Sequence, residues 1–242
     1  MRAAALDGCG CFPTGRHYAG IAHLLRTTTR GLLEEHAADA PWAALPIAVL
    51  DVETTGRDAS ADRVVEVGIA IARGGEVVER KNWLVNPGIP IPKEASDIHK
   101  ITDDDVKDAP TFAAIAPELL AALAGHVPGA YNAPFDKAFI TNELARAGLQ
   151  LRRDHEWLDP LVWARELQQE ERSRALGEVA ARLGIPLQNA HRAADDAEAA
   201  LRVLLALGRD PRVPVPYGAL VQEQRRLSMA QADLRRLRWR GS

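Results

Sequence analysis

The sequence predicts an α/β fold built on a mixed β-sheet. Two observations support this expectation. Three strand-like segments follow one another with short turns between them, and later in the chain strand-like and helix-like segments alternate. Short turns join antiparallel neighbours, whereas alternation of strands and helices is typical of parallel pairing. A hydrophobic content of 47% over 242 residues is ample for the core of such a fold.

The three successive strands are expected at residues 47–51, 64–72 and 77–85. Each is an apolar run, and Gly74 and Gly75 supply the turn between the last two. The proline-rich segment that follows, residues 86–102, is expected to be a loop. Two further strands and five helices are then expected, with strands at 127–131 and 155–158 and helices at 112–124, 135–147, 161–169, 175–183 and 193–207.

Two flanking segments complete the predicted organisation. Residues 1–45 are expected to be an amino-terminal extension, with a helix over 17–38 and a connector that contains two prolines. Residues 209–242 read as a proline-containing linker and an amphipathic helix, which leaves 46–208 as the central domain. The carboxyl-terminal helix either packs on this domain or serves as a basic arm for nucleic acid or a docking helix for a partner. Its apolar positions are Leu220, Leu227, Ala230, Leu234 and Leu237.

Charge is distributed unevenly, although the net charge is only −3. Residues 1–45 are neutral, residues 209–242 carry +5, and the central domain carries −8. Phosphate binding normally needs a basic surface, so an acidic domain argues against tight binding to long duplexes. No apolar run is long enough to span a membrane or serve as a secretory signal, which predicts a cytoplasmic protein without a membrane partner. Cys9 and Cys11 read as tail residues.

Three short blocks contain acidic side chains in positions suited to a metal site. Asp51 and Glu53 share one face at the end of the first strand, because alternate residues of a strand point the same way. Asp136 lies in "YNAPFDKAFI", and His191 precedes Asp196 by five residues in "HRAADDAEAA". Asp195 is adjacent to Asp196, and the spacing favours Asp196 as the ligand. Hard cations prefer such oxygen ligands, which favours Mg²⁺ or Mn²⁺ over zinc.

Taken together, these blocks resemble the DnaQ-like, or DEDDh, family of 3′→5′ exonucleases, which includes the proofreading ε subunit of bacterial DNA polymerase III. The resemblance covers residues 44–207 and rests on Asp-x-Glu-Thr-Thr-Gly, then Asn-x-x-Phe-Asp, then His followed five residues later by Asp. It implies an RNase H-like sheet of five strands flanked by helices. It also implies two divalent cations bound by Asp51, Glu53, Asp136 and Asp196, with His191 as the general base.

The resemblance further implies substrate contacts from residues around the acidic positions. Thr54, Thr55 and Gly56 are expected to contact the terminal nucleotide, although the same residues suit a simple turn. Asn132 and Phe135 are expected to line the substrate groove, although Phe135 also suits the core. His99, in "DIHKIT", matches a family signature whose role is mostly structural.

The function expected from the sequence is a metal-dependent 3′→5′ exonuclease that releases mononucleotides from single-stranded or frayed DNA, in proofreading or repair. Low aromatic content, 5%, favours a short grip on one 3′ terminus over an extended stacking groove. Two alternatives stay open. One is an exoribonuclease that trims RNA 3′ ends, and the other is a non-catalytic assembly subunit of a polymerase complex. The sequence leaves the oligomeric state open.

Overall fold

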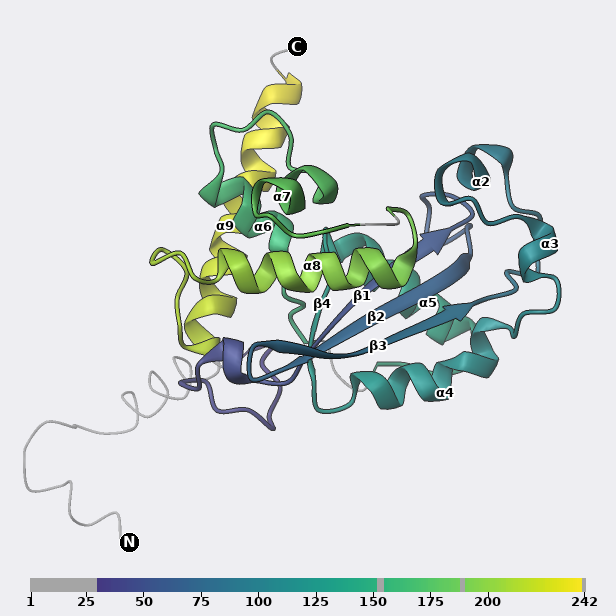
Figure 1. The fold of residues 1–242 in the computed structure, drawn as a ribbon, viewed down its shortest axis with the longest axis horizontal. Coiled ribbons are helices and arrows are strands. Elements are labelled where there is room, and N and C mark those ends of the chain that lie inside the picture. The colour runs from purple at the N-terminus through teal and green to yellow at the C-terminus, as the bar shows by residue number, and fades with distance from the viewer. Residues whose placement is uncertain (1–29, 152–154, 188–189, 241–242) are drawn as a thin grey trace, which may run out of the picture.

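The computed structural model describes residues 30–151, 155–187 and 190–240, and it is organised around a four-stranded mixed sheet (Figure 1). The strands are β1 (Ile47–Thr54), β2 (Val64–Arg73), β3 (Glu76–Leu84) and β4 (Val127–Gly129), in the order β3-β2-β1-β4. β2 pairs antiparallel with both β1 and β3, and β4 pairs parallel with β1. This confirms the predicted mixed sheet.

The fifth expected strand, at residues 155–158, is present as a single parallel bridge between Gly129 and Leu158. The amide of Leu158 donates to the carbonyl of Pro128 at 2.8 Å, and the amide of Ala130 donates to Leu158 at 3.0 Å. The ladder goes no further in the described part of this segment, because the side chain of Gln224 takes the neighbouring backbone groups. Its Nε2 donates to the carbonyl of Trp157 and its Oε1 accepts from the amide of Asp159, both at 2.8 Å.

Helices cover both faces of the sheet (Figure 1). One layer contains α6 (Pro160–Leu167), α7 (Leu176–Arg182), α8 (Ala193–Leu207) and α9 (Tyr217–Arg240), and the other contains α4 (Phe112–Leu123) and α5 (Ala133–Arg146).

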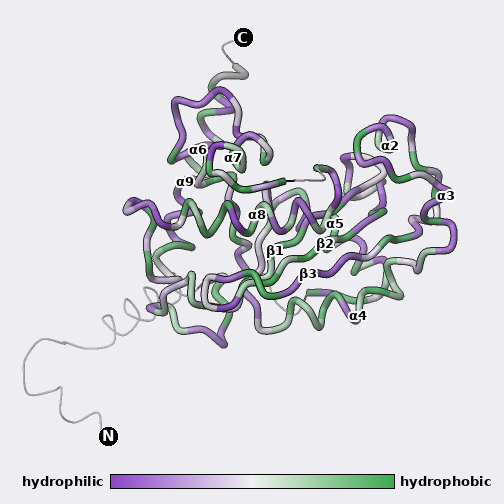
Figure 2. Tube along the Cα trace, in the orientation of Figure 1, coloured by the Kyte–Doolittle hydropathy of each residue, from purple (hydrophilic) through white to green (hydrophobic). Residues whose placement is uncertain are grey.

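The side chains of β1 alternate between the two layers. Ile47 and Val49 are buried against the α8 layer, whereas Leu50 and Val52 are buried against α4 and α5. The apolar character of β1 and β2 is visible in Figure 2. By the same alternation, Asp51 and Glu53 continue the face that meets α8.

The segment expected to be a proline-rich loop contains two short helices, α2 (Lys93–His99) and α3 (Asp103–Val106). The prediction of a continuous loop over residues 86–102 was therefore wrong. Pro92 precedes the first turn of α2, a position that proline tolerates, and Lys100 ends it with a φ of 61°. α3 begins with a capping box in which the side chain of Asp105 accepts the amide of Thr102 at 2.8 Å.

The expected amino-terminal helix lies partly outside the described residues, as do Cys9 and Cys11. Residues 30–38, which are described, form turns instead of a helix, so the expectation was wrong there. Gly31 has a φ of 80°, which is incompatible with a right-handed helix, and Leu32 and Leu33 are buried in the core beside α9. The connector contains a short 3₁₀ helix, Trp42–Ala44.

The carboxyl-terminal helix, α9, packs on the domain through its first half. Tyr217, Leu220, Val221 and Leu227 belong to the same buried cluster as β1 and α8, whereas Leu234 and Leu237 are exposed. Among the described residues, no helix has the length and hydrophobicity that crossing a membrane requires.

Candidate active site

The register of β1 and β2 brings the start of α8 next to the two acidic residues of β1. Asp51 lies opposite Gly68, and Glu53 lies opposite Glu66. Gly68 has no side chain to keep α8 away, and a Cβ at this position would lie 2.0 Å from the backbone carbon of Ala193. The first turn of α8 therefore rests directly on the backbone of β2.

Glu66 fixes this contact chemically. Its carboxylate is fully buried and accepts the amide of Ala193 at 3.0 Å and the guanidinium of Arg192 at 2.7 Å. A third hydrogen bond comes from the side chain of Asn82 on β3, at 2.8 Å. Glu66 thus holds the segment that contains His191 against the sheet. The sequence analysis missed this residue, although an acidic residue inside the apolar run "VVEVGIAI" is a signal that could have found it.

Glu53, His191 and Asp196 converge at the start of α8. Each offers one ligand atom, and these atoms lie within 4.8 Å of one another. The backbone amide of His191 donates to Oδ2 of Asp196 at 2.9 Å, and His191 has a φ of 66°, which turns the chain sharply before the helix. Asp195 points elsewhere, because it forms an ion pair with Arg80 on β3 at 2.5 Å. Of the two adjacent acids, Asp196 is thus the one that lies beside Glu53 and His191.

Asp136 reaches the cluster from α5 on the other side of β1. β4 ends opposite Val49, so the edge of β1 is unpaired beyond that point. There, the buried carboxylate of Asp136 accepts the amide of Val52 at 3.1 Å. Asp136 also lies in the first turn of α5, where the helix dipole favours a negative charge.

Asp159 and Gln224 hold the beginning of α5 in place. The buried carboxylate of Asp159 accepts the amides of Asn132 and Ala133 at 3.0 and 3.1 Å, and its own amide donates to Gln224 at 2.8 Å. Asn132 adopts a φ of 67° just before the helix, a conformation that asparagine tolerates. The sequence analysis missed both Asp159 and Gln224, which connect α9 to the helix that contains Asp136.

The carboxyl groups of the cluster have raised pKa values. Burial raises the pKa of Glu53 from 4.5 to about 8, and the neighbouring charges of Asp196 and Glu66 add to the rise. Burial by surrounding protein is also the largest cause of the raised pKa of Asp51, although this side chain keeps some exposure to solvent. The charges of Asp136, Asp196 and Glu53 then raise it further.

Asp136 and Asp196 follow the same direction. Burial raises both pKa values, and hydrogen bonds from the amides of Val52 and His191 oppose the rise. Four carboxylates therefore lie near one another in a largely buried region. Few positive charges offset them: among the described residues, Arg192 is the one cation that lowers the pKa of Glu53. This donor set of carboxylate oxygens and one imidazole fits divalent cations, which would neutralise the repulsion.

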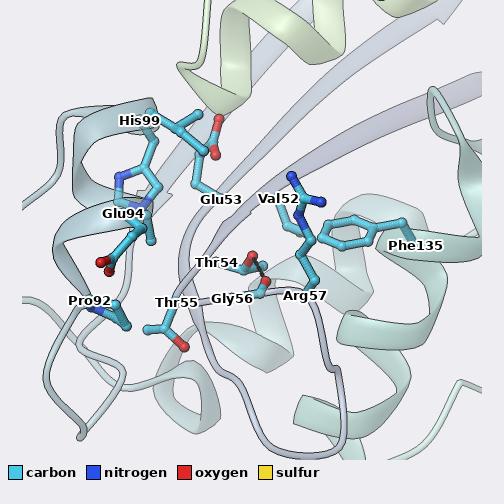
Figure 3. A pocket seen from close by; sticks show the side chains of 12 residues that line it. Val52, Glu53, Thr54, Thr55, Gly56, Arg57, Pro92, Glu94, His99 and Phe135 are labelled. Atoms are coloured by element: carbon cyan, nitrogen blue, oxygen red, sulfur yellow. Dashed lines mark hydrogen bonds between the residues drawn. The ribbon is translucent and has the colours of Figure 1, made fainter.

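A pocket of about 410 Å³ opens beside the acidic cluster (Figure 3). Figure 3 shows Glu94 and His99 from α2 on one side and Phe135 from α5 on the other, with Glu53 pointing toward the start of α8. A pocket of this volume is in the range of small-molecule sites and suits one nucleotide. Thr54, Thr55 and Gly56, which were expected to bind substrate, also line it.

The pocket residues have mixed structural and binding character. The hydroxyl of Thr54 donates a hydrogen bond to the carbonyl of Gly56 at 2.6 Å, so its proton is used within the turn. Phe135 lines the pocket, and its ring centroid lies 4.9 Å from that of Phe139 in the core. Its position is therefore compatible with a role in the substrate groove and with a role in the core. Asn132 does not line the pocket. His99 does, and burial lowers its pKa.

Comparison with known proteins identifies the family. A sequence model of an exonuclease family, named after RNase T, matches residues 48–204, which include all three acidic blocks. The chain belongs to this DnaQ-like exonuclease family. The match contains the whole acidic cluster and the pocket beside it, so the cluster lies in an exonuclease domain that uses divalent metal.

The relatives in sequence are much longer proteins. The chain is 34% identical over 156 residues to the PolC-type DNA polymerase III of Clostridium perfringens, covering 64% of this chain and 11% of that protein. It is 32% identical over 185 residues to the PolC-type DNA polymerase III of Bacillus cereus, covering 76% of this chain and 13% of that protein. The chain thus spans about an eighth of the relatives it matches.

Two solved structures have the same fold. Escherichia coli exonuclease I in complex with a dT13 oligonucleotide superimposes with a TM-score of 0.61 at 20% identity, over 69% of this chain and 42% of that one. Exonuclease X in complex with 5′ overhanging duplex DNA gives a TM-score of 0.58 at 22% identity, over 72% of this chain and 98% of that one. At this level of identity the similarity concerns the fold.

Proposed function

We propose that the chain is a 3′→5′ exonuclease that depends on Mg²⁺ or Mn²⁺ and removes nucleoside 5′-monophosphates from single-stranded or frayed DNA. The observation that supports this most directly is the convergence of Glu53, His191 and Asp196 within 4.8 Å, beside a pocket the size of one nucleotide. The family match to exonucleases supports the reaction class, and the PolC-type relatives support DNA as the substrate. The 3′ polarity follows from the resemblance to the DnaQ-like family.

Asp51, Glu53, Asp136 and Asp196 would hold two divalent cations, since their carboxylates converge and their pKa values are raised by burial. When bound, such cations stabilise the charge that develops on the attacking and leaving oxygens during phosphodiester hydrolysis. All four carboxylates fall in the central domain that the sequence suggests, residues 46–208, with flanking segments 1–45 and 209–242.

His191 would act as the general base. Its side chain is exposed at the mouth of the cluster, and an imidazole can accept a proton near neutral pH. A water oxygen forms a bond to phosphorus, His191 takes the water proton, and the bond from phosphorus to the 3′ oxygen of the preceding nucleotide breaks. The products are a nucleoside 5′-monophosphate and a strand one nucleotide shorter, whose 3′ oxygen gains a proton from solvent.

The pocket would hold the terminal nucleotide. Thr54, Thr55, Gly56 and Phe135 line it, and its volume of about 410 Å³ leaves room for one nucleotide and not for several. Asn132 would act from outside the pocket, at the start of α5. The PolC-type relatives support a polymerase as a partner, with proofreading or repair as the setting.

The test uses a 5′-labelled single strand of DNA, a matched RNA and a primer with a mismatched 3′ end, each with Mg²⁺, Mn²⁺ or chelator. The expected result is a ladder of strands shortened from the 3′ end, in the presence of either cation and not with chelator, with DNA cleaved faster than RNA. Asp51→Asn should reduce the rate by about 1000-fold or more, because this side chain lies among all the other carboxylates of the cluster. A variant that kept more than a tenth of the activity would overturn the assignment.

A further inference from the structure

Three arginines lie near one another where α6, the segment before α7 and α9 meet, since the charges of two of them act on the third. They are Arg165 on α6, Arg174 just before α7 and Arg235 on α9, and we call them the arginine cluster. The side chain of Gln231 on α9 donates to the carbonyl of Val162 on α6 at 2.9 Å. Arg165 follows Val162 by three residues and Arg235 follows Gln231 by four, so each lies on the same helix face as its neighbour in this contact.

The protein compensates the charge of the arginine cluster only in part, through the nearby carboxylate of Asp159. Within residues 30–151, 155–187 and 190–240, no carboxylate forms an ion pair with any of the three. Other arginines of the same chain segment are paired, for example Arg226 with Glu223 at 2.6 Å and Arg236 with Asp233 at 3.6 Å. Partial burial lowers the pKa of Arg165, and the nearby charges of Arg235 and Arg174 lower it further, whereas the charge of Asp159 opposes this change without forming an ion pair.

A donor inside the cluster also lacks a partner. The Nε of Arg174 is buried and has no hydrogen-bond acceptor among the described residues, while its Nη2 donates to the carbonyl of Gln169 at 2.5 Å. A buried donor without an acceptor is unfavourable, so the free protein has a positive charge and an open donor at the same place. Guanidinium groups in this state match phosphate oxygens in charge and geometry.

The arginine cluster is connected to the acidic cluster through Tyr131. The hydroxyl of Tyr131 donates to the carbonyl of Arg174 at 2.5 Å, and the next residue, Asn132, precedes the helix turn that contains Asp136. The nucleotide pocket lies on the opposite flank, beside α2. In Figure 1, α2 lies on one side of the first turn of α8, and α6, α7 and α9 lie on the other.

This arrangement lets a strand whose last nucleotide fills the pocket cross the carboxylates and leave on the other flank. We propose that the arginine cluster binds the phosphates of a single strand on the 5′ side of the bond that is cleaved. The inference rests on the proposed function, and it adds a second contact area that lies outside the acidic cluster. It also explains how a domain with a charge of −8 can attract a polyanion, because the positive charge of α9 is brought beside the path of the strand.

The test compares a long and a minimal substrate. The double variant Arg165→Gln and Arg235→Gln is assayed on the single strand dT20 and on the p-nitrophenyl ester of thymidine 5′-monophosphate, which has no 5′ extension. For dT20, kcat/KM should fall about tenfold or more, and the slope of its logarithm against log salt should flatten by about 1.4, since each phosphate contact on a single strand contributes about 0.7. For the ester, kcat/KM should stay within about twofold, because neither arginine contacts the reacting phosphate.

Matched controls are Arg226→Gln and Arg236→Gln, which remove one positive charge each from α9 at ion-paired positions. Both should leave the dT20 kinetics and the salt slope unchanged. Arg235 is exposed, so Arg235→Gln alone keeps the test valid if the double variant does not fold. This single variant should also show a lower kcat/KM on dT20 than the wild type.

Three results would overturn the proposal. Equal losses on dT20 and the ester would indicate a general structural defect, and an unchanged salt slope would remove the phosphate contacts. Normal dT20 kinetics combined with lost binding of a polyglutamate peptide would assign the arginine cluster to an acidic protein segment instead. Failure of the proposed function is distinguishable, because the wild-type protein would then hydrolyse neither substrate with Mg²⁺ or Mn²⁺.

Discussion

Replacing Glu53 with glutamine should stabilise the protein when divalent cations are removed. The pKa of Glu53 is raised from 4.5 to about 8, because burial and the charges of Asp196 and Glu66 disfavour its ionised form. The folded protein therefore binds this proton more tightly than the unfolded chain. The resulting stabilisation is complete below pH about 4.5 and is lost as the pH rises to about 8, where the buried side chain becomes charged.

The magnitude follows from the pKa difference. A rise of about 3.5 in pKa corresponds to about 5 kcal/mol, because each unit is equivalent to about 1.4 kcal/mol. At pH 9 the ionised Glu53 should thus lower the unfolding free energy by up to about 5 kcal/mol, and the neutral glutamine should restore it. For a chain of this size, the expected gain in Tm is up to about 10 to 20 °C.

The assay is thermal unfolding of wild type and Glu53→Gln from pH 5 to 9 in chelator. The two Tm curves should meet near pH 5, separate as the pH rises to about 8 and then stay apart, with the variant above the wild type. Adding Mg²⁺ or Mn²⁺ at pH 9 should raise the wild-type Tm and leave the variant nearly unchanged. Glu94→Gln, in the same pocket but outside the acidic cluster, is the matched control and should follow the wild type. Parallel curves for wild type and Glu53→Gln would refute the electrostatic reasoning.

Three further predictions concern residues that position or perform the chemistry. His191→Gln should lower kcat on a short single strand by about 100-fold or more with KM nearly unchanged, as expected for a general base; a raised KM with normal kcat would make it a binding residue. Gly68→Ala should lower the unfolding free energy measured in urea by about 1 to 3 kcal/mol, because the new Cβ would lie 2.0 Å from the backbone of Ala193; unchanged stability would show that α8 can move away at no cost. Gln224→Ala should lower the unfolding free energy by about 1 to 3 kcal/mol, because it leaves the buried amide of Asp159 without an acceptor. Slower turnover by the folded variant would confirm that this contact positions α5.

Residues that act at short sequence separation were predictable. Asp51 and Glu53 share a strand face, and His191 and Asp196 lie on either side of a helix start, so local spacing places each pair. Asp136 was predictable through the resemblance to a known family, since its approach to β1 depends on the early end of β4. The antiparallel strands followed from the short turns that join them.

The supporting residues were not predictable in this way, because their roles depend on contacts between distant segments. Glu66 meets Arg192 only when β2 lies under α8, and Asp159 meets Gln224 only when α9 folds back on the sheet edge. The strand at 155–158 was overpredicted in length because the competing partner, Gln224, lies far away in sequence. The prediction of a helix over residues 30–38 was wrong for a local reason, because Gly31 has a positive φ.

The packing of α9 determines how this catalytic unit could be moved into another polypeptide. The family match ends at residue 204, yet the buried core continues through Tyr217, Leu220 and Leu227. A fusion that ended at residue 204 would remove the part of α9 that packs against α6 and residues 32–33. It would also remove Gln224, which accepts the hydrogen bond from the backbone amide of Asp159. A transferable exonuclease module should therefore include Leu32, Leu33 and the first half of α9, beyond the limits that sequence similarity alone would suggest.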